Sequence, residues 1–158
     1  MTFFIASKKY DDEISVITTS KQQVLYGESE PATCKPRKRI LIVDDEFDTN
    51  LTIKVVLEED NFKVDSFTDP RAALRNYTTG LYDLILIDVR MPVMNGFALY
   101  NEIKKLDNDI KICFLTAAED TYYETFRKQA YPKYDENCII RKPVENESLI
   151  KQINSIIG

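Results

Sequence analysis

Residues 81–96 read LYDLILIDVRMPVMNG, and the order of residue types in this stretch is informative. It contains a continuous apolar run, Leu84-Ile85-Leu86-Ile87, that ends at a carboxylate, Asp88. Such runs, bounded by turn residues, are typical of strands buried on both faces of a parallel sheet. Pro92 and Gly96 then mark a loop. Asp88 is either a simple turn former or a side chain at the carboxyl end of a central strand, where open α/β sheets bind ligands.

The rest of the chain repeats this alternation of strand and helix signals. Asp69 and Pro70 suit the cap and first turn of a helix. Five strands that alternate with five helices predict a doubly wound α/β domain with a parallel sheet. Besides the strand ending at Asp88, strands are expected at 40–43, 63–67, 110–115 and 138–141, and helices at about 49–59, 70–77, 97–106, 120–130 and 146–157.

Two of the expected helices have assignable core positions. Asp48 or Thr49 is expected to cap the helix at 49–59, because short polar side chains accept hydrogen bonds from free amides there. Helical periodicity selects the residues that face the sheet. They are Leu51, Val55, Val56 and Leu57 in this helix, and Leu149, Ile150, Ile153, Ile156 and Ile157 in the last one.

Composition limits the possible functions. The 158 residues are 44% apolar and 30% charged, which is typical of one globular domain, and no run of about 18 apolar residues predicts a membrane span. The three cysteines lack metal-ligand spacing, as in reduced cytosolic proteins. The absence of histidine excludes histidine-based catalysis, and the net charge of −5 disfavours nonspecific nucleic-acid binding. We expect a cytoplasmic protein without membrane or direct DNA contacts.

The chain divides into an N-terminal extension and a domain. Residues 1–38 have no sustained periodicity and are expected to form a mobile linker or tail. The domain is expected to cover residues 39–158. Because the chain stops one helix after Lys142-Pro143, we expect a stand-alone domain with no C-terminal effector.

Polar residues with chemical potential follow four of the predicted strands. Asp44-Asp45, Asp88, Thr116 and Lys142 are expected to meet at one edge, because parallel strands end on the same side. Three clustered carboxylates repel one another, and Mg²⁺ with oxygen ligands relieves the repulsion. One carboxylate can then act as a nucleophile toward a phosphoryl group, with Lys and Thr contacting its oxygens. The pattern predicts phosphoryl transfer without histidine.

These residues resemble the receiver domain of two-component response regulators over roughly residues 38–158. The match comprises the acidic end of ILIVDDE at Ile40–Glu46, the pattern DxxMPxMxG from Asp88 to Gly96, Thr116-Ala117 and Lys142-Pro143. The resemblance implies a flavodoxin-like (βα)₅ fold with strand order 2-1-3-4-5.

The resemblance also implies a role for each site residue. Asp88 would be the phosphoacceptor, Thr116 the switch hydroxyl and Lys142 the partner of the phosphoryl group. Pro143 would follow a cis peptide bond. The Mg²⁺ ligands would be Asp44, Asp45, Asp88 and the backbone carbonyl of Arg90.

By the same resemblance, the protein would be a signalling module and not an enzyme. A histidine kinase or phosphotransfer protein would phosphorylate Asp88 in a phosphorelay. Phosphorylation would switch a surface formed by the helix at 120–130, the fifth strand and the last helix, which would bind an unidentified downstream protein.

Two departures from the family pattern concern that surface. Ile139 occupies the position where receivers usually carry Tyr or Phe, and 130–137 replaces the usual Ala-x-x-x-Gly-Ala stretch. We hypothesise that the output face is remodelled, with Tyr131 or Tyr134 in place of the missing aromatic residue.

Three alternatives stay open. A receiver-like interaction module that is never phosphorylated fits Ile139. A haloacid-dehalogenase-type phosphatase would need an Asp-x-Asp pattern after the first strand and room for a cap domain. A flavodoxin-like cofactor binder would need a phosphate loop there, but Asp44-Asp45-Glu46 would repel phosphate.

Overall fold

The structure is a computed structural model that describes residues 36–117 and 138–158. From Arg37 onward, these residues belong to one compact unit, Arg37–Gly158. The predicted tail lies almost wholly outside the described residues, as do the predicted helix at 120–130 and the candidate aromatic residues Tyr131 and Tyr134. These expectations stay predictions.

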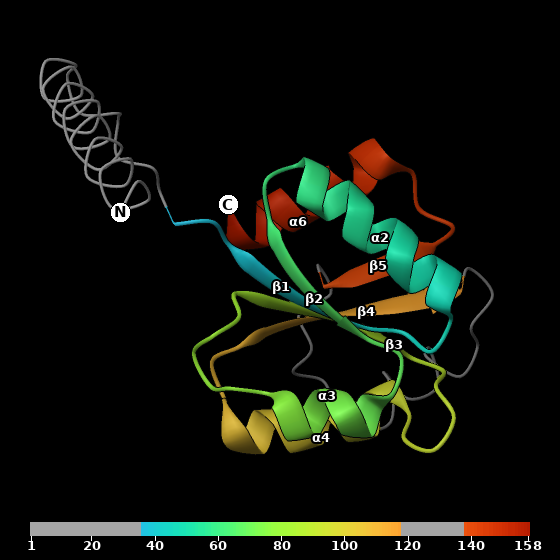
Figure 1. The fold of residues 1–158 in the computed structure, drawn as a ribbon, viewed down its shortest axis with the longest axis vertical. Helices are drawn as coiled ribbons and strands as arrows, with labels where there is room; N and C mark the ends of the chain where they lie inside the picture. Colours follow the sequence, from blue (N-terminus) through green and yellow to red (C-terminus); the bar gives the residue numbers. More distant parts are fainter. Residues whose placement is uncertain (1–35, 118–137) are drawn as a thin grey trace, which may run out of the picture. The chain divides into compact units, whose positions relative to one another are not determined.

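A five-stranded parallel sheet forms the centre of this unit (Figure 1). Its order is β2-β1-β3-β4-β5, which confirms the predicted flavodoxin-like arrangement. The observed bounds agree with the sequence prediction to within two residues. The strands are β1 Arg39–Val43, β2 Lys63–Phe67, β3 Leu84–Asp88, β4 Lys111–Ala117 and β5 Ile139–Lys142.

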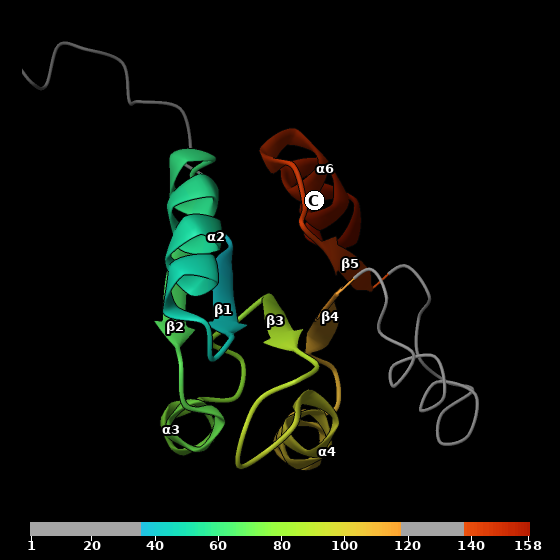
Figure 2. The ribbon, with the colours of Figure 1, turned by 90° about the vertical axis from the view of Figure 1, so that its right-hand side faces the viewer.

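Helices cover both faces of the sheet. Figures 1 and 2 show α2 and α6 on one face and α3 and α4 on the other. This doubly wound arrangement is what right-handed crossovers between parallel strands produce. The bounds are α2 Phe47–Glu59, α3 Pro70–Asn76, α4 Gly96–Leu106 and α6 Asn146–Ile157.

The central strands are buried on both faces because helices lie above and below them. Successive side chains of a strand point to opposite faces, so β1 and β3 supply two separate apolar clusters. Each fully buried aliphatic side chain contributes about 1.5–3 kcal/mol. Toward α3 and α4 the strands present Leu41, Val43, Ile85 and Ile87, and toward α2 and α6 they present Ile40, Ile42, Leu84 and Leu86.

In two helices, a side chain at the N-cap accepts a hydrogen bond from a backbone amide of the first turn. Asp69 accepts a hydrogen bond from the Arg71 amide (2.8 Å) and Pro70 occupies the first turn, which confirms the predicted start of α3. Asn95 accepts a hydrogen bond from the Ala98 amide (2.9 Å) and starts α4. The second cap ends the loop that leaves β3 at Asp88.

The prediction for α2 was wrong in two respects. The helix begins at Phe47, so Asp48 and Thr49 lie inside it, and Glu46 at the N-cap makes no capping hydrogen bond through its side chain. Leu51 and Val55 were predicted to face the core but are 47% and 43% exposed.

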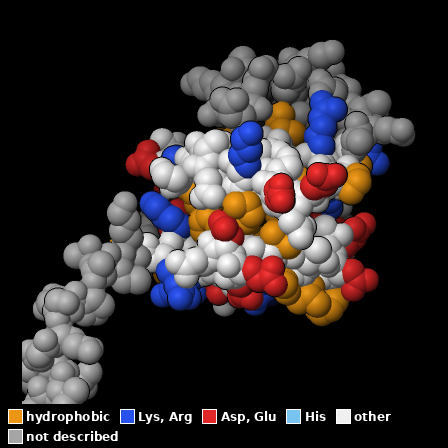
Figure 3. Space-filling view, turned by 90° about the horizontal axis from the view of Figure 1, so that it is seen from above, with side chains coloured by type: hydrophobic (Ala, Val, Ile, Leu, Met, Phe, Trp, Pro, Cys, Tyr) orange, Lys and Arg blue, Asp and Glu red, His pale blue; other side chains and the backbone are white. Residues whose placement is uncertain are grey.

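The physical reason is that α2 carries two stripes at helical spacing. Phe47, Leu51 and Val55 form an exposed apolar stripe, whereas Asn50, Ile53 and Leu57 are buried. Apolar side chains therefore reach the surface on the face that α2 and α6 cover (Figure 3). The prediction for α6 is confirmed. Leu149, Ile153 and Ile157 are buried, and Ile150 and Ile156 are partly buried against them.

Within residues 36–117 and 138–158, every helix is too short or too polar to cross a membrane.

Candidate functional site

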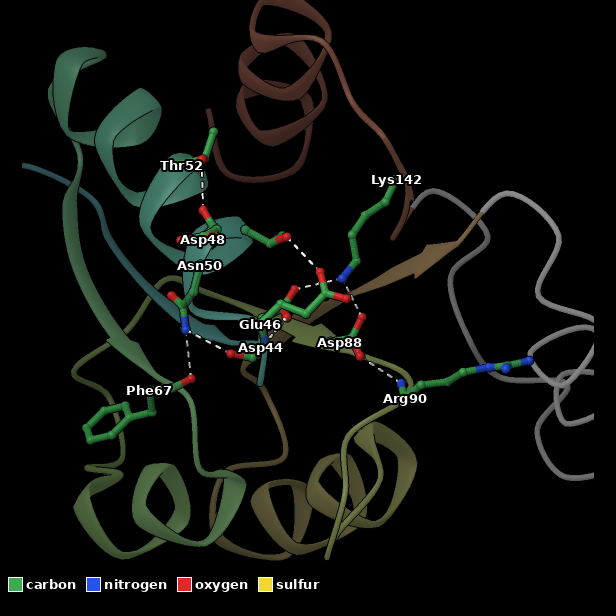
Figure 4. A network of polar contacts seen from close by, with 10 residues as sticks. Asp44, Glu46, Asp48, Asn50, Thr52, Phe67, Asp88, Arg90 and Lys142 are labelled. Carbon is green, nitrogen blue, oxygen red and sulfur yellow. Dashed lines mark hydrogen bonds and ion pairs between the residues drawn. The ribbon is translucent and has the colours of Figure 1, made fainter.

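The predicted convergence at the carboxyl edge of the sheet is present. Lys142 Nζ lies 2.8 Å from Asp44 Oδ2 and 2.7 Å from Asp88 Oδ1 (Figure 4). Asp44, Asp45 and Asp88 each place one carboxylate oxygen within 4.8 Å of the other two. The ends of β1, β3 and β5 therefore bring two carboxylates to one ammonium group, with the Asp45 carboxylate close to both.

Asp44 is completely buried directly after β1. Its Oδ1 accepts a hydrogen bond from the Glu46 amide (3.0 Å), and its Oδ2 accepts one from Lys142. Since burying a carboxylate without partners would be very costly, these two hydrogen bonds stabilise the buried Asp44. Asp45, the next residue, is partly exposed and lines the open side of the site.

Asp88 is buried at the last position of β3. Its Oδ2 accepts a hydrogen bond from the Arg90 amide (2.8 Å) and its Oδ1 contacts Lys142. Burial raises the pKa of Asp88 to about 6, with a smaller contribution from the charge of Asp44, while Lys142 and the Arg90 amide partly oppose this increase. Asp88 is therefore mostly ionised at neutral pH, although its charge is poorly stabilised.

Lys142 is the cation that the carboxylates share. Burial alone would lower its pKa, but the hydrogen bonds to Asp44 and Asp88 outweigh burial and raise the pKa above its ordinary value. Lys142 therefore stays positively charged. The peptide bond to Pro143 is cis, as predicted.

Thr116 and Arg90 complete the set of predicted residues. Asp88 pairs with Leu115 in the sheet register, so Thr116 lies one residue further toward the carboxyl edge. Thr116 is buried, and its hydroxyl donates to the carbonyl of Ala117 (3.3 Å). The Arg90 side chain extends away from the carboxylates in Figure 4, whereas its amide contacts Asp88. The roles of these residues stay predictions.

A cleft of about 590 Å³ opens at this site. Its walls come from the N-terminal turns of α2 and from the strand ends that carry the acidic residues. Such a cleft at the carboxyl edge is the usual ligand position in open α/β sheets. Among its lining residues are Asp45, Glu46, Asp88, Ala117 and Lys142.

Gly96 has a role that its sequence signal did not reveal. From the sequence, Gly96 was interpreted as a loop marker and as the last residue of the pattern DxxMPxMxG, with no structural role assigned. A Cβ atom at this position would lie 2.4 Å from the carbonyl oxygen of Asp88. Only glycine permits the first turn of α4 to approach the backbone of Asp88 so closely.

Asn50 is a second residue that sequence reasoning missed. Its Nδ2 donates to the carbonyl oxygens of Asp44 (3.1 Å) and Phe67 (2.9 Å), and Figure 4 shows it beside Asp44. A polar residue within a predicted helix carries no signal for such a contact. The only available pattern was its helical spacing from Ile53 and Leu57.

The donor set fits a hard divalent cation. Three carboxylates that each offer an oxygen within 4.8 Å of the others match the ligands that Mg²⁺ prefers. They also repel one another, and a bound cation would relieve this repulsion. The site is an acidic pocket of the kind that binds Mg²⁺.

Comparisons with known proteins agree with the fold. The family model for the response regulator receiver domain matches residues 40–154. Response regulator ArlR of Staphylococcus saprophyticus is 33% identical over 119 residues, which are 75% of this chain and 52% of ArlR. The chain thus spans about half the length of this curated relative.

Solved structures give the same result. The non-phosphorylated HemR receiver domain of Leptospira biflexa has 27% identity and a TM-score of 0.66, with 77% of this chain and 95% of that chain covered. Response regulator TrrA of Thermotoga maritima, in complex with Mg²⁺-BeF, has 28% identity and a TM-score of 0.63, with 75% and 98% covered. This chain belongs to the response regulator receiver domain family of two-component systems.

Proposed function

We propose that the domain at residues 39–158 accepts a phosphoryl group on Asp88 in a Mg²⁺-dependent reaction. The observation that carries this proposal is the shared ion pair. A buried carboxylate at the end of β3 lies 2.7 Å from Lys142, beside two further carboxylates and at the wall of an open cleft.

Asp44, Asp45, Asp88 and the backbone carbonyl of Arg90 would hold the Mg²⁺ ion. When bound, the ion supplies positive charge to the carboxylates and to the phosphoryl oxygens. The fit of three clustered carboxylates supports this assignment. The Mg²⁺-BeF complex of TrrA, a relative with 28% identity, supports it as well.

The transfer step would proceed on the ionised form of Asp88. One of its carboxylate oxygens attacks the phosphorus of a phosphohistidine, forming an O–P bond while the N–P bond breaks, and the electron pair returns to the imidazole of the donor. Lys142 remains charged and stabilises the phosphoryl oxygens. The Thr116 hydroxyl would donate to one of these oxygens. The donor would be a histidine kinase or a phosphotransfer protein.

Phosphorylation would switch a surface that includes β5 and α6. A downstream protein would bind to this surface. Lys142 ends β5, so a displacement of its ammonium group acts directly on that strand. Ile139, which replaces the usual aromatic residue, is partly buried and packs against the apolar cluster on the α4 side. The third part of this surface, the predicted helix at 120–130, lies outside the described residues.

A receiver-like module that acts without phosphorylation is the second candidate function. Ile139 favours it, because an aliphatic side chain cannot perform the aromatic rotation that family members use. The assembled ion pair between Lys142 and Asp88 favours the first candidate.

The decisive experiment is the intact mass of the protein after incubation with acetyl phosphate, with and without Mg²⁺. We expect one phosphoryl adduct in the wild type with Mg²⁺ and none in Asp88→Asn. Asp60→Asn removes an exposed carboxylate at the end of α2 and should retain the adduct. An adduct that persists in Asp88→Asn would overturn the assignment. No adduct in any protein would favour the second candidate.

A further inference from the structure

Asn50 is buried although it is polar, with 3% of its surface exposed. It lies in the N-terminal part of α2, one helical turn after Glu46, whose carbonyl accepts a hydrogen bond from the Asn50 backbone amide (2.9 Å). Its side chain points to the ends of β1 and β2 and not to the cleft (Figure 4). This position is beneath the acidic site, in direct contact with the backbone of Asp44.

The side-chain amide of Asn50 closes a ring of three hydrogen bonds. Its Nδ2 donates to the carbonyls of Asp44 (3.1 Å) and Phe67 (2.9 Å), and the Asp44 backbone amide donates to the same Phe67 carbonyl (3.2 Å). The ends of β1 and β2 and the start of α2 are thereby fixed to one another. Both backbone polar groups of Asp44 take part in this ring.

The Asp44 carbonyl belongs to the peptide group that joins Asp44 to Asp45. Because a peptide group is planar, holding this oxygen fixes the orientation of the whole unit. The direction in which each aspartate side chain leaves the backbone depends on that orientation. Asn50 therefore acts on both carboxylates at once, without contacting either carboxylate group.

The side-chain oxygen of Asn50 shows that this orientation of the amide costs free energy. Within the described part of the chain, Asn50 Oδ1 is the single buried side-chain polar atom that has no hydrogen-bond partner. Turning the amide over would bring its oxygen against two carbonyl oxygens, which is worse. The cost of the orphaned oxygen is tolerated because the amide nitrogen serves two backbone acceptors.

We propose that Asn50 is a positioning residue that sets the relative orientation of the Asp44 and Asp45 carboxylates for Mg²⁺ binding. This inference rests on the proposed function, since it concerns the same metal site. Residues that orient metal ligands without touching the metal affect affinity strongly, and their loss typically weakens binding about 10–100-fold.

The test is a titration of metal-free protein with Mg²⁺, followed by the NMR signal of the Asp45 amide. Asn50→Leu keeps the approximate volume and removes both donors. We expect Mg²⁺ affinity to fall by about tenfold or more. The matched control is Leu57→Val, which loosens the core two turns further along α2, where Leu57 is fully buried. The control should melt at a lower temperature than the wild type but bind Mg²⁺ with unchanged affinity.

The outcomes separate this inference from the proposed function. If the wild type itself binds no Mg²⁺, the proposed function fails. If the wild type binds and Asn50→Leu binds as tightly as Leu57→Val, Asn50 is merely structural and the inference is overturned. Should Asn50→Leu not fold, Asn50→Ser replaces it, because one hydroxyl donor serves at most one of the two carbonyls. Wild-type affinity in Asn50→Ser would equally overturn the inference.

Discussion

Both edges of the sheet carry aspartates, but the partners of these aspartates differ. At the amino edge, where strands begin, Asp83 accepts hydrogen bonds from Lys38 Nζ (3.0 Å) and the Arg39 amide (2.8 Å). Asp107 accepts them from the Tyr77 hydroxyl (2.9 Å) and the Gly80 amide (3.2 Å). Each of these two carboxylates has its own donors.

At the carboxyl edge, three carboxylates lie close together and two of them share one lysine. Asp44 and Asp88 share the ammonium group of Lys142, and Asp45 lies close to both. The pKa values reflect this difference, because burial raises the pKa of Asp88 to about 6. Burial acts in the same direction on Asp107, but hydrogen bonds from Tyr77 and backbone amides outweigh it and lower the pKa of Asp107. The amino edge is arranged for stability, and the carboxyl edge retains unfavourable charge that a ligand can neutralise.

Replacing one lysine at each edge should give the largest contrast. Lys142→Met leaves Asp44 and Asp88 buried without their cation and should reduce the free energy of unfolding by about 3–5 kcal/mol in metal-free buffer. Lys38→Met breaks an exposed ion pair with Asp83 and should cost less than about 1 kcal/mol. Urea unfolding of both variants measures this. Equal losses would contradict the proposed difference between the edges.

One glycine at each edge gives the next contrast. Gly96→Ala places a methyl group against the Asp88 carbonyl, at 2.4 Å before relaxation, and should destabilise by about 2–3 kcal/mol. Gly80→Ala meets no atom within 4 Å, but its φ of +76° strains an alanine by about 1 kcal/mol. Thermal unfolding separates the two costs. In addition, Gly96→Ala should alter the NMR signal of the Asp88 amide, whereas Gly80→Ala should not.

Neutralising one aspartate at each edge should change stability in opposite directions. Without Mg²⁺, Asp88→Asn removes a repelling charge and should raise the free energy of unfolding by about 1 kcal/mol. Asp45→Asn should act in the same direction. Asp107→Asn weakens hydrogen bonds from Tyr77 and Gly80 and should lower the free energy of unfolding by about 1 kcal/mol. Denaturant unfolding in EDTA provides the values, and a loss of stability in Asp88→Asn would contradict a shared acidic site.

The pH dependence of stability should also differ between the two edges, again with opposite signs. The pKa of Asp88 is raised from 3.8 to about 6 in the folded state, so the native protein binds the proton more tightly than the unfolded chain. The contribution of Asp88 to the free energy of unfolding therefore falls as pH rises from about 4 to about 6. The pKa of Asp107 is lowered, so its contribution is lost as pH falls.

This prediction is tested by subtracting the stability curves of variants from that of the wild type across this range. Asp88→Asn should remove a decrease in stability between pH 4 and 6, and saturating Mg²⁺ should remove the same decrease. Identical slopes of stability against pH for wild type and Asp88→Asn would show that burial does not shift the pKa of the Asp88 carboxyl group.

The strands and most of the site could be predicted from sequence because they depend on local patterns. An apolar run that ends at a polar residue, as at Asp88, defines both a buried strand and its exit. Parallel topology then brings Asp44, Asp88 and Lys142 to one edge without further information. The burial of each group and its distances to its partners needed the structure.

The orientation of α2 could not be predicted because its sequence contains two competing stripes. Leu51 and Val55 are as apolar as Ile53 and Leu57, so periodicity alone does not select the buried face. In the structure the buried face carries Asn50 together with Ile53 and Leu57. A buried amide within that stripe contradicts simple hydrophobic patterning, and for this reason Asn50 was missed.

The contact between Lys142 and Asp44 joins residues 98 positions apart in the chain. The lysine reaches Asp44 only after β5 has paired with β4, so this contact depends on the strand that follows the other four in the chain. Closing a loop of this length costs conformational entropy, which the strand pairing must offset. A nascent chain without β5 therefore has the acidic residues but lacks their cation. The proposed phosphoacceptor site is complete only once β5 has joined the sheet.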